Sequence, residues 1–141
     1  MKLSLQDLPP GLRPPRFVRP NGEYAWGGKD LEEVFVDAIR EQVAVASAEL
    51  LYVTPGATYG SVPFVEDGAV KWYLCIWQAP DKEPDQPWPD FVAASIAFAK
   101  EWLAKWTPES SLPPGDGIIY YLLDLESAET YPERHTYRWA L

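Results

Sequence analysis

The chain is poor in the residues on which most metal and nucleophile sites depend. Its 141 residues include one cysteine and one histidine. The single cysteine, Cys75, excludes an intramolecular disulfide and a zinc site built on cysteines, and it is typical of a reducing compartment. The single histidine, His135, excludes a metal site built on a histidine pair and any proton relay that needs two imidazoles.

Positive charge is also scarce. The chain has 12 Lys and Arg against 21 Asp and Glu, which gives a net charge of −9. We therefore expect neither direct nucleic-acid binding nor attachment to an anionic membrane, because both need clustered Lys and Arg. No apolar run approaches the roughly 18 residues of a membrane span, and the first seven residues contain no signal-peptide core. These absences favour a cytoplasmic protein whose acidic surface serves solubility or suits a basic partner.

Recognisable catalytic motifs are lacking as well. The stretch Gly27-Gly28-Lys29-Asp30 does not have the spacing of a phosphate-binding loop, and no G-x-S-x-G elbow occurs. Cys75 and His135 are conceivable as a nucleophile and its base. However, Cys75 stands between two large apolar residues of an expected strand, where a buried and inert thiol is the ordinary outcome.

Polar residues near the C-terminus leave one question open. Asp124 and Glu126, close in sequence to His135, could form a carboxylate pair for acid–base chemistry or bind a divalent ion. Asp124 could equally form a cross-strand ion pair with Arg134. We favour the ion pair, because no D-x-D-x-D-G metal loop is present. We therefore expect no catalytic residues, no cofactor and no metal.

Proline and aromatic residues are abundant. The 15 prolines are about twice the average share of ~5%, and they are expected to stiffen the connections. Residues 1–28 form a Pro/Gly-rich N-terminal arm, and residues 29–141 are expected to form a single domain. The arm carries Lys2, Arg13, Arg16 and Arg19. It could lie against the acidic body or contact a partner, and we favour the first.

Two helices are predicted from periodicity and from helix-start signals. Pro89–Trp106 begins with proline and an acidic residue, and from Phe91 to Ala99 it is apolar nearly all round. Such a helix is expected to be covered on most sides. A second helix is predicted from Leu31 to about Ala48, with Asp30 and Glu33 as a capping box. Its end is left open, because 44–53 also fits a strand.

The remaining apolar runs predict strands. An Asp-Gly turn at 66–69 is expected to join strands 59–65 and 70–77 into a hairpin. Large groups on both faces of 70–77 predict a central strand, and so do those of 118–125, whereas Pro63 predicts a bulge or an edge. Strands at 17–18 and 133–141 complete the set. The expected fold class is α+β, with a two-layer antiparallel or mixed sheet of four to five strands and two helices packed on one face.

Aromatic residues beside Gly and Pro give the strongest functional signal. They could anchor an interface, or they could close the edges of the core. We expect a non-catalytic acidic protein-binding module that docks a basic partner, such as an inhibitor or immunity-type protein. A structural or assembly subunit of a phage or secretion particle and a small-molecule-binding domain remain alternatives. The expected partner-binding residues are Tyr24, Trp26, Tyr59, Asp81, Glu83, Asp85, Trp88 and Tyr131.

Overall fold

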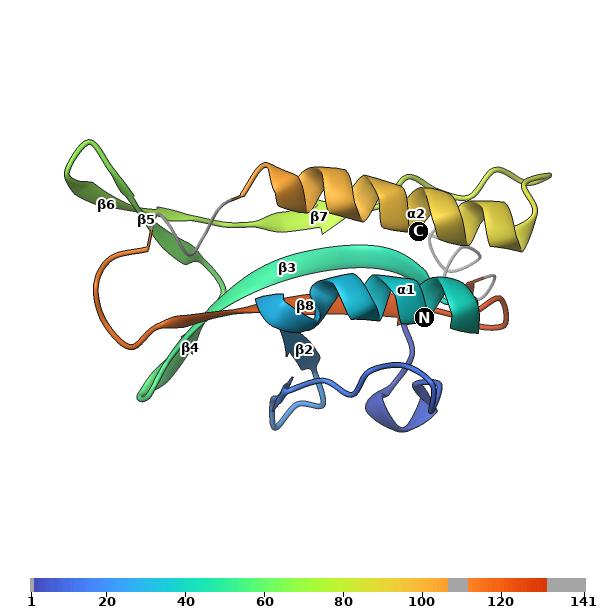
Figure 1. The fold of residues 1–141 in the computed structure, drawn as a ribbon, viewed down its shortest axis with the longest axis horizontal. Helices are drawn as coiled ribbons and strands as arrows, with labels where there is room; N and C mark the ends of the chain where they lie inside the picture. The colour runs from blue at the N-terminus through green and yellow to red at the C-terminus, as the bar shows by residue number, and fades with distance from the viewer. Residues whose placement is uncertain (1, 107–111, 132–141) are drawn as a thin grey trace.

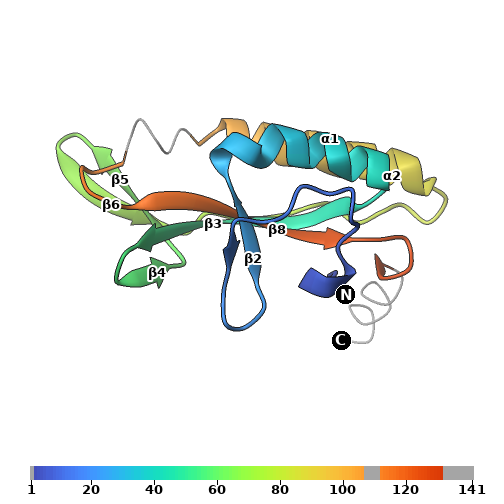
Figure 2. The same ribbon diagram turned by 60° about the horizontal axis from the view of Figure 1, so that its bottom comes forward.

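The structure is a computed structural model that describes residues 2–106 and 112–131. Two helices, α1 (Leu31–Glu41) and α2 (Trp88–Ala104), lie side by side on one face of a sheet (Figures 1 and 2). The α+β class with two helices on one face is as predicted, but within the described residues the sheet has six strands rather than four to five, and a second sheet of two strands is also present. The strands of the sheet are β1 (Phe17–Val18), β2 (Tyr24–Gly27), β3 (Ala44–Thr54), β4 (Ala57–Tyr59), β7 (Ile76–Gln78) and β8 (Ile118–Glu126).

Strands β3 and β8 form the centre of the sheet. The order is β1-β2-β8-β3-β4, β7 shares the outer edge of β3 with β4, and every pairing is antiparallel. The prediction of a central strand at 118–125 is therefore confirmed. Its side chains Leu123 and Leu125 are fully buried, as are Leu50 and Val45 of β3. A second sheet of two strands, β5 (Val62–Glu66) and β6 (Ala69–Tyr73), extends from one end of the molecule (Figure 1).

Helix α1 ends earlier than the predicted helix. Gln42 adopts a left-handed conformation with φ 57° and ψ 44°, and its backbone N–H closes the helix by donating to the carbonyls of Ala38 and Ile39. The chain then enters β3 at Ala44. Of the two outcomes left open for residues 44–53, the strand is correct, and the extension of the helix to Ala48 is wrong.

Helix α2 is confirmed with nearly the predicted bounds, but its surroundings differ from the prediction. The expectation of cover on most sides is wrong, because Ala93, Ala97 and Phe98 are exposed. One polar residue on the buried side, Ser95, has its hydrogen bonds satisfied. Its hydroxyl donates to the Val92 carbonyl at 2.9 Å and accepts from the Val45 N–H at 3.1 Å. The residues that α2 buries are Phe91, Val92, Ser95, Ile96 and Ala99.

The chain before α1, including the short 3₁₀ turns Leu5–Asp7 and Gly28–Asp30, packs in cis against the body. The Leu3 N–H donates to the Leu125 carbonyl at 2.7 Å, and Trp26 is buried with its indole N–H on the Arg13 carbonyl at 2.8 Å. Asp30 is only 2% exposed and accepts hydrogen bonds from the guanidinium of Arg16, which lower its pKa. Arg13 Nε lies 2.9 Å from the same carboxylate. The capping-box prediction is therefore wrong, because these arginines engage the Asp30 side chain instead.

Candidate functional site

The hairpin of β5 and β6 forms as the Asp-Gly signal predicts. Asp67 and Gly68 have φ values of 50° and 78°, so both lie in the left-handed region that a tight hairpin turn of this type requires. Residues directly opposite each other in an antiparallel pair share a face. The register therefore gives the hairpin an inner face with Val62, Phe64, Lys71 and Tyr73, and an outer face with Pro63, Val65, Val70 and Trp72.

The inner face fixes the hairpin to the body. Val62 and Phe64 are buried, and the Phe64 ring stacks on Trp106 with 5.4 Å between ring centroids. Trp106 follows the end of α2, so this stack joins the hairpin to the helix layer. The Tyr73 hydroxyl donates to the Glu66 carboxylate at 2.8 Å, and this hydrogen bond raises the pKa of Tyr73. The hairpin is thus held by packing as well as by its own strands.

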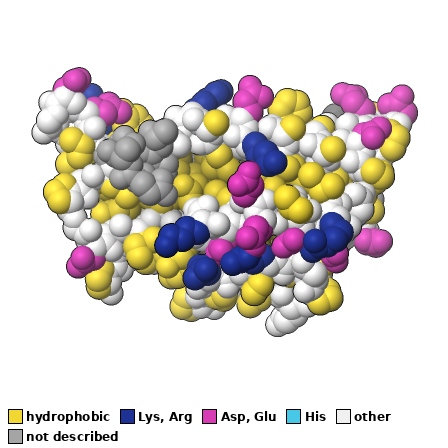
Figure 3. Space-filling view, in the orientation of Figure 1, with side chains coloured by type: hydrophobic (Ala, Val, Ile, Leu, Met, Phe, Trp, Pro, Cys, Tyr) yellow, Lys and Arg dark blue, Asp and Glu magenta, His cyan; other side chains and the backbone are white. Residues whose placement is uncertain are grey.

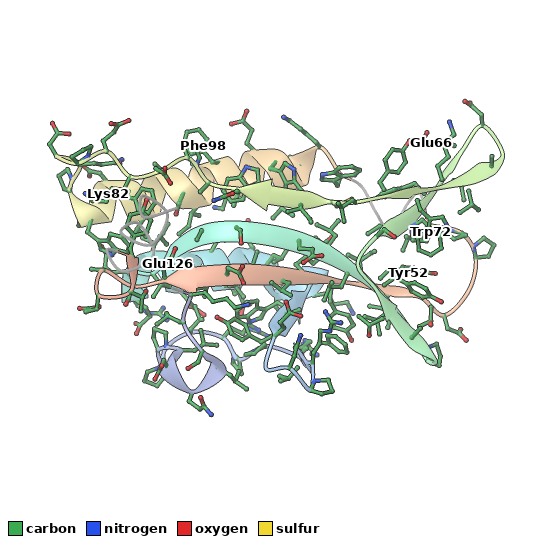
Figure 4. The ribbon with its side chains drawn as sticks, turned by 180° about the vertical axis from the view of Figure 1, so that it is seen from behind. Tyr52, Glu66, Trp72, Lys82, Phe98 and Glu126 are labelled. Atoms are coloured by element: carbon green, nitrogen blue, oxygen red, sulfur yellow. The ribbon has the colours of Figure 1, made fainter. Side chains whose placement is uncertain are left out.

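The outer face is apolar, and Val65, Val70 and Trp72 on it are exposed, whereas Pro63 is buried. The Trp72 ring contacts Tyr52 edge-on at 5.9 Å and Tyr59 at 5.3 Å between centroids, and Figure 4 shows Trp72 beside Tyr52. The Tyr52 ring in turn lies against Gly117, where a Cβ would clash with the ring. Glycine at this position therefore leaves the ring room. Trp72 thus packs on the rings of Tyr52 and Tyr59, but half of its surface remains exposed to solvent.

The predicted central position of strand 70–77 is wrong. Its first half, β6, pairs with β5, and its second half, β7, pairs with β3, while Leu50 N–H donates to the Cys75 carbonyl between them at 3.0 Å. Large groups on both faces predicted burial on both faces, but the structure covers one face only. The four residues on the other side were therefore missed as surface residues. They are Val70, Trp72, Leu74 and Ile76, with exposed fractions of 51%, 51%, 68% and 53%.

We name residues 69–78 the β6–β7 edge, because this continuous stretch borders the molecule. Within the part of the chain that the structure describes, β6 pairs only with β5, and β7 only with β3. Lys71 is the one charged residue in the stretch, and its ammonium lies 3.6 Å from the Glu66 carboxylate. The edge therefore presents an apolar row with no unpaired charge of its own.

Acidic residues stand at both ends of the β6–β7 edge. Before it, Glu66 ends β5 and Asp67 lies in the hairpin turn, and an acidic proline-rich loop follows it. Figure 3 shows Asp and Glu side chains gathered over the hairpin and over the opposite end of the molecule. Glu49 lies beside Ile76 in the sheet register. Burial, followed by the neighbouring carboxylates of Glu23 and Asp124, raises the pKa of Glu49. The exposed acids of the loop are Asp81, Glu83 and Asp85.

The loop that carries these acids is fixed at both ends. The backbone N–H of Lys82 donates to the Tyr131 hydroxyl at 2.7 Å, and the Trp88 indole N–H donates to the Gln42 carbonyl at 2.9 Å. The Trp88 and Tyr131 rings lie 5.7 Å apart between centroids. The Lys82 ammonium is held against the backbone of the loop, because its Nζ donates to the Glu83 carbonyl at 3.0 Å. The loop therefore holds its exposed carboxylates, those of Asp81, Glu83 and Asp85, in a defined position.

The structure does not gather the predicted partner-binding residues into one site. Tyr24, Trp26 and Tyr131 are buried, so they close the edges of the core and offer no surface to a partner. This corrects their assignment as contact residues. Trp88 is half-buried at the start of α2, and Tyr59 is exposed in β4 beside Trp72. Figure 1 shows β4 and the start of α2 toward opposite ends of the molecule. Asp81, Glu83 and Asp85 are exposed at the other end of the β6–β7 edge.

The structure describes three of the residues that were considered for chemistry, Cys75, Asp124 and Glu126. Cys75 is buried as predicted, and burial raises the pKa of its thiol to about 11. Asp124 accepts a hydrogen bond from the Ser47 hydroxyl at 2.7 Å and lies 3.3 Å from Lys2 Nζ. Glu126 is buried. His135, Arg134 and the predicted strand 133–141 lie outside the described residues. No group of three metal-ligating side chains is found among residues 2–106 and 112–131.

Two further findings bear on the class of protein. In the described ranges, neither helix has the length and apolar character needed to cross a bilayer. Comparison with known proteins gives no match to any protein-family model, to any curated protein or to any solved structure. Function must therefore be argued from the site itself.

Proposed function

We propose that this protein is a non-catalytic binding module that docks a basic protein partner through the β6–β7 edge. The observation that carries the proposal is the row of exposed apolar side chains that begins on a hairpin whose other face is fixed to the body and continues to Ile76 of β7. Contiguous exposed apolar surface marks interaction sites in folded proteins. Trp72 has the properties of an interface anchor, because tryptophan is enriched among residues that dominate binding energy.

Charge supports a basic partner. The chain carries a net charge of −9, and acids stand at both ends of the apolar row. Complementary charge around an apolar centre speeds association and selects among partners, and its effect weakens as salt rises. An inhibitor or immunity-type protein that covers a basic surface fits this arrangement. The single cysteine is a buried thiol, which fits the proposed cytoplasmic location.

The same edge favours one alternative, a subunit of a larger assembly. An unprotected strand edge can pair with another copy of the chain. The acids at both ends oppose this, because two copies would bring like charges together. Light scattering separates the two functions: a monomer supports the binding module, and an oligomer that Trp72→Ser dissociates supports the assembly subunit.

The proposal is tested by capture from a lysate of the source organism with three immobilised proteins. The wild type is compared with Trp72→Ser and with Phe98→Ser, which removes an aromatic ring of similar exposure, 45%, from helix α2. We expect the wild type and Phe98→Ser to retain a basic protein at low salt and release it at high salt. Trp72→Ser should not retain it. Absence of a salt-sensitive basic partner, or full retention by Trp72→Ser, would contradict the proposal.

A further inference from the structure

We infer that the partner binds by strand addition: an extended segment of the basic protein pairs its backbone with the outer edge of β7 and runs on along β6. This inference rests on the proposed function, and it adds the mode of binding and the chemistry of the segment that is bound.

Backbone geometry identifies the groups that would receive the segment. The Cys75 carbonyl accepts from the Leu50 N–H, and the Ala79 N–H donates to the Ala46 carbonyl. In an antiparallel ladder the N–H and C=O of one residue point to the same side, and this side alternates along the strand. Residues 75, 77 and 79 therefore face β3. Ile76 and Gln78 direct their N–H and C=O groups outward, where the described residues place no further strand.

Side chains along the edge repeat with the period of a strand. Val70, Trp72, Leu74 and Ile76 are every second residue, and all four are about half exposed or more. An added strand places its own alternate side chains against such a row, so backbone hydrogen bonds give affinity and the side-chain contacts give specificity. A flat apolar patch without this period would not prefer an extended ligand.

The edge also lacks the features that keep strands from pairing with other chains. Folded proteins protect edges with lysines, prolines, bulges or charges that point inward. Residues 69–78 contain no proline, and their one lysine, Lys71, is engaged by Glu66. An unprotected edge of this length is expected where the protein pairs its strand with a segment of another chain.

Charge identifies the occupant as a basic segment rather than a second copy of this chain. The acids Glu66 and Asp67 precede the edge, and Asp81, Glu83 and Asp85 follow it. In either strand direction, a second copy would bring its own acidic ends against these acids. A segment of about ten residues, ~33 Å long at ~3.3 Å per residue, with Lys or Arg at both ends and alternating apolar residues between, matches both the charge and the period.

The experiment selects random twelve-residue peptides displayed on phage against the intact protein, and it then synthesises the retained sequences. We expect alternating apolar residues in the middle and Lys or Arg near both ends. Binding should slow the hydrogen exchange of the Ile76 and Gln78 amides about tenfold or more, because both become hydrogen bonded. N-methylation of alternate peptide amides should weaken binding about tenfold, and N-methylation of the intervening amides should not.

A matched pair of variants tests the backbone directly. Gln78→Pro removes an outward N–H, and Gln78→Thr keeps it, so only the proline variant should lose the selected peptides. If Gln78→Pro does not fold, the exchange measurement on the wild type decides. Peptides without alternation, peptides bound with unchanged exchange at Ile76 and Gln78, or no retained peptide would each overturn strand addition. The proposed function would still stand if a basic protein is captured through Trp72, and both would fail if nothing basic is captured.

Discussion

The two borders of the sheet are built in opposite ways. At one border, β1 has two residues, Arg16 and Arg19 flank it, and prolines 14, 15 and 20 surround it. At the other border, β7 continues directly from β6 of the two-stranded sheet, and this β6–β7 edge of ten residues carries a row of exposed apolar side chains. Short strands, prolines and charge are the usual protection of an edge. One border is therefore protected against pairing with other chains, and the other is not. This difference agrees with the proposal that the open border binds a partner.

Tryptophan shows the same contrast. Beside the protected border, Trp26 of β2 is fully buried and contacts Tyr24 edge-on at 5.5 Å between ring centroids. At the open border, Trp72 contacts two tyrosine rings but stays half in solvent. One tryptophan supports the fold, and the other is available for binding. The same type of substitution should therefore have different effects on stability and on binding at the two borders.

The largest expected effect is on stability at the protected border. Trp26→Ala should lower the free energy of unfolding by about 3–5 kcal/mol, because it leaves a large cavity in the core. Trp72→Ala should lower it by about 1 kcal/mol, since only its contacts with Tyr52 and Tyr59 are lost. Urea unfolding of both variants measures the difference. Similar losses for the two would contradict the contrast between the borders.

The next effect is on binding at the open border. Ile76→Lys should weaken binding of the selected peptide or the captured protein by about thirtyfold, as expected for a central contact residue. Val18→Lys on β1 is the control, because it replaces a residue of similar exposure, 47%, and adds the same charge. Titration calorimetry compares their dissociation constants. Equal weakening by both lysines would indicate that net charge, rather than the open edge, governs binding.

A smaller effect concerns the contact that holds the N-terminal arm. Hydrogen bonds from Arg16 lower the pKa of Asp30 below its ordinary value of 3.8. The ionised carboxylate therefore stabilises the fold above about pH 4, and this contribution is lost as pH falls through the lower folded-state pKa. Asp30→Asn should lower Tm at pH 7, and its difference from the wild type should shrink below pH 4. Thermal unfolding over pH 2.5–7, by circular dichroism, measures this, and a difference independent of pH would contradict it.

The smallest effect concerns Glu49, which lies beside Ile76. Burial raises its pKa above the ordinary 4.5, so the folded state disfavours its ionised form, and wild-type stability decreases as pH rises from 4.5 through the folded-state pKa. Glu49→Gln should therefore raise Tm slightly at pH 7 and change nothing below pH 4. The same variant should weaken binding of a basic segment by about threefold. Tighter binding by Glu49→Gln would argue against a basic occupant.

Local signals in the sequence predict much of the fold. Proline and an acid at the start of α2, the Asp-Gly turn and the apolar run of β8 act through neighbouring residues, and all three elements form as predicted. Strand β2 was missed, because it has only four residues, one of them a glycine, and its pairing with β8 is settled by distant parts of the chain. The end of α1 was misplaced, because it depends on one left-handed residue, Gln42.

The candidate site shows the limit of such signals more sharply. A strand with large groups on both faces is expected to be covered on both, and the sequence cannot tell whether the cover is the same chain or another one. Trp72 and Ile76 were therefore predicted as interior residues, and the acids of the loop were predicted as contacts without the apolar edge that joins them to the hairpin. The exposed fractions of the Trp72 and Ile76 side chains, which depend on the whole fold, show that the described part of this chain does not cover them.

The position of β8 in the sheet has a consequence for synthesis of the protein. Strand β2 comes near the beginning of the chain and β3 in its first half, yet both pair with β8, which comes near the end. Until the ribosome has made β8, both strands lack this central neighbour, although β1, β4 and β7 can already pair with them, and the sheet stays unfinished. Closing it requires contacts between distant parts of the chain, which slows folding. The edges of β2 and β3 that β8 later fills should thus be most vulnerable to misassociation on the nascent chain, before β8 can reach them.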